Sequence, residues 1–419
     1  MARGEGVRGA DRRLILILCG TVYLATAGGQ PSPSLYPAVS RDFDLSTAVV
    51  GQLSTASMFV SIATALIFAP LSDLVGRKRM ILIGLALSAA AGFGSALAPS
   101  FTALLVIRLF AGAGWASITP AVYALAADRF TGQTRAVAIG WITSCLSLGG
   151  IFTNVVMTQV AAVSSWRGSV WLYTVIGTLG VFVLARLLPA DPPAGRVDKG
   201  SFRALFTGGI FAPLKDIPTR ALIGSNIGRS LHWWAMLTYI SSLWVDVYGV
   251  SIAVVGGLNL LTSVGYLIGV NVSSRLIPRA GAQRVNVWAN ALAFPVLVAE
   301  TALLAPLPVM VATAALYSAC MGAGYATQQT LLLAVTPAHR RGATTGLNAS
   351  AVQVGGVFAS VLGGIIIGTL GYRWLGPLLG WCSLAAALWI RRDVPEDAAS
   401  PLVGGRQSVV ASEQPTSGR

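Results

Sequence analysis

Twelve long apolar runs, separated by short polar segments, dominate this sequence. A helix that crosses about 30 Å of hydrocarbon needs around 20 mostly apolar residues, and each run meets that length. The runs are apolar throughout and do not alternate with a period of two, which excludes the strands of a membrane barrel. We therefore expect an all-α membrane protein with twelve transmembrane helices. The predicted spans are residues 14–38, 47–71, 79–99, 101–127, 136–162, 167–189, 220–247, 251–276, 284–305, 307–333, 342–370 and 372–391.

The composition excludes a water-soluble protein. Hydrophobic residues make up 54% of the 419 residues and charged residues only 11%, whereas soluble domains carry about 25% charge. The net charge of +14 comes from basic residues that lie between the apolar runs, so it indicates orientation in a membrane and not a nucleic-acid partner. The four cysteines lie in apolar runs without CxxC spacing, and the two histidines are far apart. We expect no disulfide framework, no metal site and no cofactor.

The distribution of basic residues orients the chain. With the N-terminus in the cytoplasm, 24 of the 29 basic residues fall on the cytoplasmic side, as the positive-inside rule requires. Residues 1–30 resemble a secretion signal, with a basic leader followed by LILILC, but eleven further spans follow. We expect a multi-pass protein, a monomer, with both termini in the cytoplasm.

The longest polar break divides the spans six and six. Five regions result: a cytoplasmic tail, a six-helix bundle, a central cytoplasmic loop, a second six-helix bundle and a disordered cytoplasmic tail rich in Pro, Ser and Gly. Their respective boundaries are 1–13, 14–189, 190–219, 220–391 and 392–419.

The two bundles resemble each other in sequence. TAVVGQL at 47–53 matches IAVVGGL at 252–258, and GAGWA at 112–116 matches GAGYA at 322–326, at offsets of 205 and 210. Because the matches keep their order and spacing, we interpret the chain as a duplicated six-helix unit. Two such bundles related by a pseudo-two-fold axis leave a cavity at the membrane midplane, as alternating access requires.

The loop between the second and third spans carries a family resemblance. Residues 71–79 read LSDLVGRKR, which is similar to the G-x-L-x-D-R-x-G-R-K signature of the major facilitator superfamily; Ala69 and Leu74 depart from it. The resemblance implies a conformational lock formed by Asp73, Gly76, Arg77, Lys78 and Asp128. In the family the acid at Asp73 caps the eleventh helix, here near residues 342–345, and the Arg at Arg77 pairs with an acid such as Asp128. The alternative is that these charges only set the topology.

Two further motifs resemble those of the same family. Arg108 in RLFAGAGWAS is similar to the fourth-helix motif R-x-x-x-G-x-G, in which the Arg is associated with proton coupling. Alternatively, its side chain reaches toward the outer interface. The fifth-helix motif of drug and metabolite antiporters, G-x-x-x-G-P-x-x-G-G, is only partly present around Gly149 and Gly150 and lacks its proline. The helix-packing glycines of these motifs are Gly112, Gly114, Gly149 and Gly150.

The seventh span carries an unusual polar face. Asn226, Arg229, His232 and Trp233 are spaced so that they lie near one helical face, about 14 Å from the cytoplasmic end. An intramembrane arginine predicts a substrate site, and the alternative is a cluster of hydrogen bonds that only holds the helices together. Family geometry lines the cavity with the first, fourth, seventh and tenth helices, which adds further candidates. These are Tyr23, Thr26, Gln30, Trp115, Tyr317, Tyr325 and Gln328.

Acidic residues are nearly absent from the spans. Only Glu300 lies clearly inside one, near its outer end, so a cavity with Arg229 favours an anionic or electron-rich substrate. Proton coupling then depends on a group other than a midplane acid. The candidates are Arg108, His232, Glu300 and Asp73.

The resemblance implies secondary active transport by alternating access. We expect proton-coupled efflux of small organic metabolites or drugs across a bacterial inner membrane, similar to the twelve-helix drug:proton antiporter branch. The alternative is an importer, a proton symporter, of a small organic anion such as a carboxylate. The expected partners are a small-molecule substrate, protons and the lipid bilayer. No GxxxxGK[ST], GxSxG or HExxH sequence is present, so we expect neither ATP use nor enzyme activity.

Overall fold

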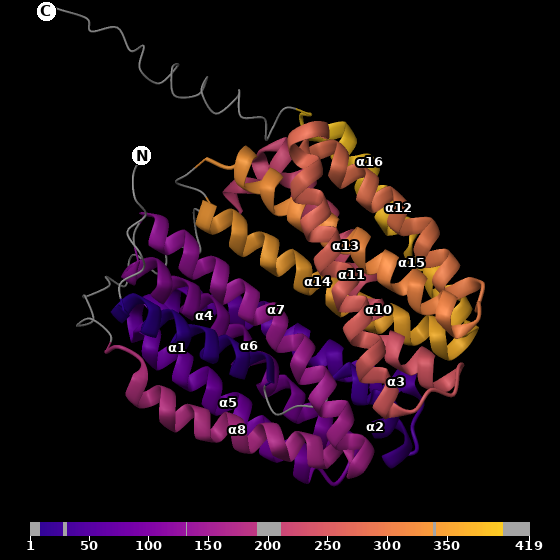
Figure 1. The fold of residues 1–419 in the computed structure, drawn as a ribbon, viewed down its shortest axis with the longest axis horizontal. Coiled ribbons are helices and arrows are strands. Elements are labelled where there is room, and N and C mark those ends of the chain that lie inside the picture. The colour runs from indigo at the N-terminus through magenta and orange to yellow at the C-terminus, as the bar shows by residue number, and fades with distance from the viewer. Residues whose placement is uncertain (1–8, 28–31, 131, 191–210, 338–340, 397–419) are drawn as a thin grey trace, which may run out of the picture. The chain divides into compact units, whose positions relative to one another are not determined.

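The computed structural model describes residues 9–27, 32–130, 132–190, 211–337 and 341–396, and in these residues every regular element is a helix (Figure 1). The residues predicted as terminal tails and central loop fall largely outside this range, as does Gln30. The long helices of the first half are α1 (Gly9–Ala27), α4 (Gln52–Val75), α5 (Arg77–Leu97), α6 (Phe101–Arg129), α7 (Gly132–Val163) and α8 (Trp166–Leu187). Those of the second half are α10 (Ile217–Asp246), α11 (Ile252–Ala280), α12 (Ala282–Ala302), α13 (Leu307–Val335), α14 (Arg341–Leu370) and α16 (Trp381–Asp393). Short helices are η1 (Pro33–Leu35), α2 (Tyr36–Asp42), α3 (Thr47–Val50), η3 (Ala212–Lys215), η5 (Tyr372–Trp374) and α15 (Leu375–Leu379).

Each of the twelve predicted spans contains helix, but the first, second and last are interrupted, the second at Gly51 between α3 and α4. The first helix ends at Ala27, and the chain resumes helical structure with η1 and α2, each of which has a proline in its first turn. Proline is tolerated there because the first amides of a helix have no partner within it. The last span is divided at Gly380 into α15 and α16.

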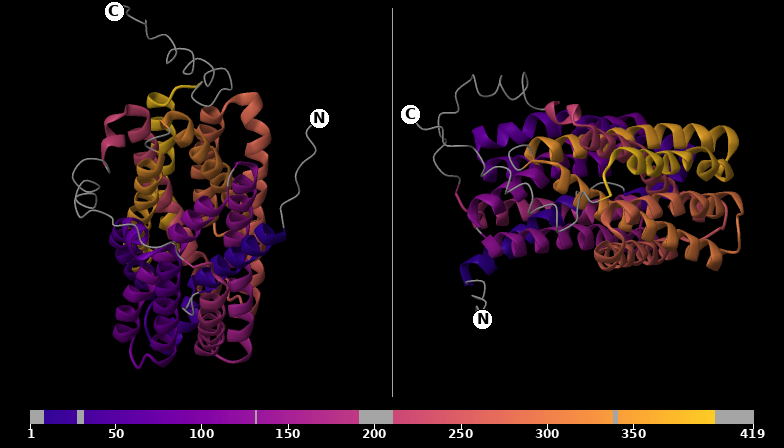
Figure 2. Two further views of the ribbon diagram at one scale, coloured as in Figure 1. Left: turned by 90° about the vertical axis from the view of Figure 1, so that its left-hand side faces the viewer. Right: turned by 90° about the horizontal axis from the view of Figure 1, so that it is seen from above.

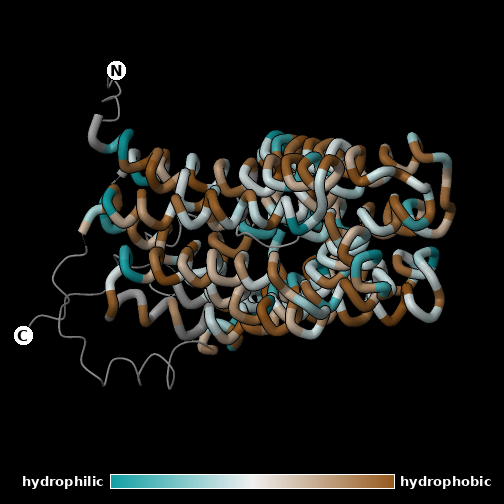
Figure 3. The backbone as a smooth tube through the Cα atoms, turned by 90° about the horizontal axis from the view of Figure 1, so that it is seen from below, coloured by the Kyte–Doolittle hydropathy of each residue, from teal (hydrophilic) through white to brown (hydrophobic). Residues whose placement is uncertain are grey.

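The helices have the length and composition of membrane spans. In the described residues, nine helical stretches are long and apolar enough to cross a bilayer. Figure 3 shows that hydrophobic residues occupy long parts of the helices. Helix α10 is not among the nine because Asn226, Arg229 and His232 lower its hydropathy. The structure is therefore that of a multi-pass membrane protein.

Two glycines begin equivalent helices in the two halves. Gly76 precedes α5 with φ 106° and Gly281 precedes α12 with φ 84°, and both helices have 21 residues. These positive φ values are unfavourable for residues with a Cβ atom, which explains the glycine at each position. The same backbone conformation recurs at an offset of 205 residues and thus supports the interpretation of a duplicated unit.

The described helices form two compact units. Unit 1 comprises residues 1–204, 234–260 and 356–370, and unit 2 comprises residues 205–233, 261–355 and 371–419. This partition differs from the predicted halves because parts of α10, α11 and α14 belong to unit 1.

Hydrogen bonds attach these parts to the first-half helices inside unit 1. Thr47 Oγ1 donates to Asp246 Oδ2 at 3.0 Å, and Gln159 Nε2 donates to the carbonyl of Ala253 at 2.8 Å. The carbonyl of Ser360 on α14 accepts hydrogen bonds from Gln52 Nε2 of α4 at 3.4 Å and from Tyr239 Oη of α10 at 2.7 Å. These bonds explain why the ends of α10, α11 and α14 group with helices of the first half.

Small residues allow the helices of each unit to approach closely. A Cβ atom at Gly112 of α6 would lie 2.1 Å from the carbonyl oxygen of Ser57 on α4. In unit 2, a Cβ atom at Gly269 of α11 would lie 1.9 Å from the carbonyl oxygen of Ala319 on α13. Van der Waals contact between close backbones is a main source of helix association in lipid.

The other predicted packing glycines differ in how closely a neighbouring helix approaches them. Gly114 lies against Ser88 of α5, and Gly149 lies against Thr26 of α1. A Cβ atom at Gly150 would meet no atom within 4 Å. Close helix contact therefore explains Gly112, Gly114 and Gly149 but does not explain Gly150.

The surroundings of Gly112 and Gly150 predict opposite effects on stability when each glycine is replaced by alanine. We expect Gly112→Ala to destabilise the protein by about 1–3 kcal/mol, because α4 and α6 must separate to admit a methyl group. We expect Gly150→Ala to be neutral or to stabilise by up to about 1 kcal/mol, because alanine favours the helix. Thermal unfolding of both variants in the same detergent measures the difference, and equal midpoints would contradict the packing described here.

Candidate functional site

Charged residues tie together helix ends in unit 1. Arg77 Nε, at the start of α5, lies 3.3 Å from Asp128 Oδ2, near the end of α6. Lys78 Nζ donates to the carbonyl of Leu188, just after α8, at 2.8 Å. The Asp128 side chain is 55% exposed, so the ion pair itself contributes little to stability. Asp73 lies in α4, but its side chain and the residues at 341–343 fall outside the described side chains.

Arg108 is buried within unit 1. Its Nε donates to the carbonyl of Leu53 at 3.3 Å and its Nη2 donates to the hydroxyl of Tyr36 at 3.2 Å. The side chain is 7% exposed. It therefore bonds to α2 and α4, and does not extend to the surface of the protein.

Arg229 of unit 2 is held by two asparagines. Its Nε donates to Asn226 Oδ1 at 3.0 Å, one helical turn earlier on α10. Asn226 Nδ2 in turn donates to Asn348 Oδ1 of α14 at 2.8 Å. Arg229 is 5% exposed and both asparagines are buried. The amides fix the direction of the guanidinium group but supply no negative charge.

No ion pair that the structure describes includes Arg229. A buried cation normally has a paired anion, because removing a charge from water is costly. Glu300, the one acid that lies clearly inside a predicted span, also has no hydrogen-bond partner for either carboxylate oxygen in the described residues. The site thus presents an arginine whose charge is not neutralised by a neighbouring carboxylate.

Aromatic rings surround the arginine. The guanidinium carbon lies 5.6 Å from the ring centre of Tyr325, and that tyrosine is 40% exposed. Trp233 stacks on Tyr266 of α11 with ring centres 5.6 Å apart, and contacts Tyr317 at 6.0 Å. A cation beside aromatic faces is well suited to a planar, negatively charged solute.

His232 is buried in the same cluster. Its Nδ1 lies 2.6 Å from the hydroxyl of Tyr317 on α13, and its Nε2 has no partner in the described part of the chain. Gln328 Nε2 donates to the carbonyl of Leu222. Tyr317 and Gln328 are about 1% exposed, so they hold α10 against α13 in this conformation. The structure therefore brings Asn226, Arg229, His232, Trp233, Tyr317 and Tyr325 together, with Gln328 closer to the start of α10.

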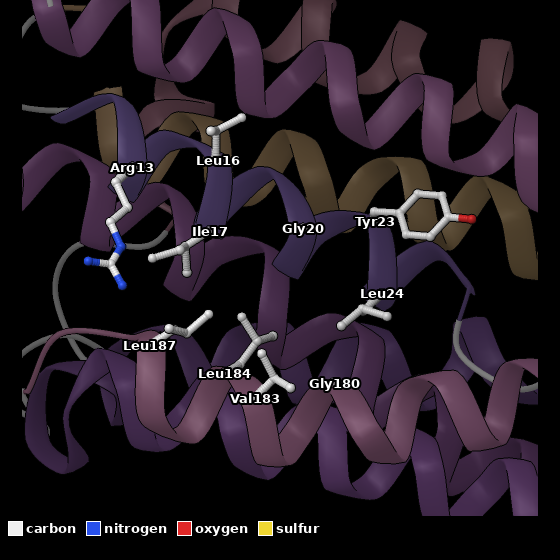
Figure 4. A pocket seen from close by; sticks show the side chains of 10 residues that line it. All are labelled: Arg13, Leu16, Ile17, Gly20, Tyr23, Leu24, Gly180, Val183, Leu184 and Leu187. Atoms are coloured by element: carbon white, nitrogen blue, oxygen red, sulfur yellow. The ribbon is translucent and has the colours of Figure 1, made fainter. Parts of the chain in front are cut away.

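The candidates of the first half lie in unit 1. Trp115 of α6 is 37% exposed. Thr26 Oγ1 donates to the carbonyl of Tyr23 at 2.7 Å within α1. Tyr23 lines a pocket of about 520 Å³ between α1 and α8, whose other residues are almost all apolar (Figure 4).

Several polar residues of unit 2 were not identified from the sequence. Asn286 of α12 donates to the carbonyl of Gly324 and to Thr327 Oγ1 of α13, at 3.0 and 2.9 Å. Asn290 follows one turn later and donates to Asn286. Two asparagines four residues apart in an apolar run were the available signal, since buried amides in a membrane helix need partners. In the described residues, no group of three or more His, Cys, Asp or Glu side chains gathers as a metal site would require.

The fold and the buried polar cluster define a multi-pass helical membrane protein, the class that includes secondary transporters. The family model of the Major Facilitator Superfamily matches residues 16–299 and 291–415. The chain belongs to the major facilitator superfamily.

Individual relatives agree with this assignment. The chain is 26% identical over 226 residues to the "Uncharacterized transporter YgaY" of Escherichia coli O157:H7, covering 53% of this chain and 57% of that protein, so it spans little more than half of that relative's length. It is 25% identical over 417 residues to the "Gallate transporter" of Pseudomonas putida, covering 90% of each chain. The crystal structure of a D-xylose-proton symporter shares the fold, with a TM-score of 0.73, 15% identity and coverage of 92% of this chain and 98% of that one.

Proposed function

We propose that this protein is a secondary active transporter for a small organic anion that carries a planar or aromatic group. The observation that carries this proposal is Arg229, which is buried, has no carboxylate partner in the described residues and lies beside the exposed ring of Tyr325. A solute carboxylate would supply the missing negative charge, and the neighbouring rings would contact its planar part.

The resemblance to a gallate transporter supports this substrate class. Gallate is an aromatic carboxylate, so it combines the two chemical features that the Arg229 cluster favours. Tyr23, Thr26 and Trp115 of unit 1 remain predicted contact residues, and Gln30 remains a prediction outside the described residues. Asp73, Gly76, Arg77, Lys78 and Asp128 remain the proposed conformational lock, to which the Arg77–Asp128 ion pair lends support.

The proposed direction is export driven by proton entry across a bacterial inner membrane, with both termini in the cytoplasm. One charge that moves through 100 mV supplies about 2.3 kcal/mol, enough for a gradient of roughly 50-fold. The second candidate is import of the same class of anion with protons, which is equally compatible with an Arg229 that has no carboxylate partner among the described residues.

Vesicles of opposite orientation separate the two directions. We expect everted membrane vesicles to accumulate radiolabelled gallate or benzoate when their interior is acidified, because an exporter moves solute into such vesicles in exchange for protons. Accumulation only in right-side-out vesicles with an inward proton gradient would indicate import. No proton-dependent accumulation of either acid in either orientation would contradict the proposed substrate class.

Asn226→Asp tests the role of the unneutralised arginine. We expect the new carboxylate to pair with Arg229 and to abolish the thermal stabilisation that a saturating aromatic carboxylate gives the wild-type protein, about 2.7 kcal/mol at 100 times its Kd. The unliganded variant should be as stable as the wild type, because Asn348 can turn its amide to donate to the new oxygen. Gln159→Glu adds the same charge far from Arg229 in the chain and should leave binding unchanged. Full ligand stabilisation of Asn226→Asp would contradict the proposal.

A cysteine pair within unit 1 tests alternating access. A Cβ atom at Gly368 of α14 would lie 3.7 Å from Ala48 Cβ of α3, close to the mean of about 3.8 Å in disulfides. In a variant without the four native cysteines, Ala48→Cys with Gly368→Cys should form a disulfide and stop transport until it is reduced. The control pair Ala48→Cys with Gly346→Cys should not cross-link, because Gly346 lies about 33 Å along α14 from Gly368. Undiminished transport by the cross-linked protein would contradict a mechanism in which these helix ends separate.

A further inference from the structure

Glu300 is a buried acid without a chemical partner in the described structure. It lies on α12, two residues before the helix ends at Ala302, and is 1% exposed. Neither of its carboxylate oxygens accepts or donates a hydrogen bond within the described residues. An ionised carboxylate in such a place would lack both water and a counter-charge, whereas a neutral carboxylic acid avoids most of that cost.

The elements that pack against α12 provide few charges near this position. On α13, Tyr317 lies close enough to Glu300 for the two groups to interact electrostatically, and Cys320 follows one turn later. The short helix η5, which packs against α12, contains Tyr372, which is half-buried, and Arg373, which is exposed. Helix α15 brings no titratable group, and α16 brings Cys382 and then, at its far end, Arg391, Arg392 and Asp393. Of the titratable groups on these elements, Tyr317 is the one that also contacts the Arg229 cluster, through His232.

Tyr317 connects this position to the arginine cluster. Its hydroxyl lies 2.6 Å from His232 Nδ1, and His232 interacts electrostatically with Arg229, one turn earlier on α10. The series Glu300, Tyr317, His232 and Arg229 thus lies entirely within unit 2 and crosses from α12 through α13 to α10.

We propose that Glu300 is the residue that binds the coupling proton, and that Tyr317 and His232 link its protonation to Arg229. The step is binding of one proton by the carboxylate to form the neutral acid, and its release reverses this without any other bond changing. A negative Glu300 would compete with an anionic solute for the positive potential of the Arg229 cluster, whereas a neutral Glu300 would not. The proton and the anion would therefore bind together, as import of the anion with protons requires. This inference rests on the second candidate of the proposed function, because it assigns the proton of that symport cycle to one group.

The location of Glu300 suits controlled access to water. The carboxyl group lies within about one helical turn of the end of α12, and so needs only a small opening of the surrounding helices to become hydrated. Hydration stabilises the ionised form and releases the proton. A conformational change of unit 2 would therefore switch Glu300 between a proton-retaining and a proton-releasing state.

Infrared difference spectroscopy of the full-length protein in lipid nanodiscs tests the proposal without any transported solute. We expect a carbonyl band of a protonated carboxylic acid at neutral pH in the wild type, and loss of that band in Glu300→Gln. Gln mimics the neutral acid, so this variant should fold as the wild type does. The matched control is Glu396→Gln, which removes an exposed carboxylate paired with Arg284 and should leave the band unchanged. Absence of the band in the wild type, or its persistence in Glu300→Gln, would overturn the assignment.

Two further variants test the link to the arginine cluster. Tyr317→Phe and His232→Gln should each shift the frequency of the Glu300 band and the pH at which it disappears, since each changes the polar series beside the carboxyl group. Unchanged bands in both variants would overturn the link through Tyr317 and His232. Because these spectra need no substrate, failure of the proton assignment is distinguishable from failure of the vesicle assays to find a transported anion.

Discussion

The dominant physical constraint on this chain is that lipid offers no partner for buried polar groups. Hydrogen bonds of the helical backbone satisfy the main chain, so the structure in the described residues consists of helices and short connections. Lipid tails are as apolar as leucine, and therefore helix association depends on close contact and on bonds between side chains. Glycines provide close contact between α4 and α6 and between α11 and α13. The asparagines of α12 provide hydrogen bonds to α13.

Two arginines buried in the spans, Arg108 and Arg229, meet this constraint with different hydrogen-bond partners. Arg108 donates to a backbone carbonyl and to a tyrosine hydroxyl from two neighbouring helices, so its bonds join elements of unit 1. Within the described residues, Arg229 donates to Asn226 on its own helix, and its guanidinium carbon lies 5.6 Å from the ring centre of Tyr325. The bonds of Arg108 therefore join elements of unit 1, whereas we propose that the charge of Arg229 binds the solute. Figure 2 shows from two further sides the long helices that pack side by side within each unit, as α5 does with α6 and α12 does with α13.

Sequence patterns predicted the helices well because hydropathy directly reports the solvent that a span must face. The twelve spans, the polar face of α10 and the proximity of Arg77 to Asp128 could all be anticipated, the last through the family motif. The bond from Asn226 to Asn348 could not, since it joins residues 122 positions apart and asparagine is common outside binding sites. The grouping of the ends of α10, α11 and α14 with unit 1 could not be predicted either, because it depends on contacts between residues far apart in the chain.

The two halves differ in their buried ionisable residues at positions that the internal repeat makes equivalent. At the offset of 210 residues that relates GAGWA to GAGYA, Arg108 corresponds to Ser318, a small residue on α13. At the offset of 205 that relates Gly76 to Gly281, Glu300 corresponds to Ser95, which is also fully buried. Arg108 and Glu300 thus each correspond to a buried serine in the other half, whereas Arg229 corresponds to Leu24 at the offset of 205. A serine can bond to its own helix and leave no net charge, so each site could gain or lose its ionisable group without disturbing the other half.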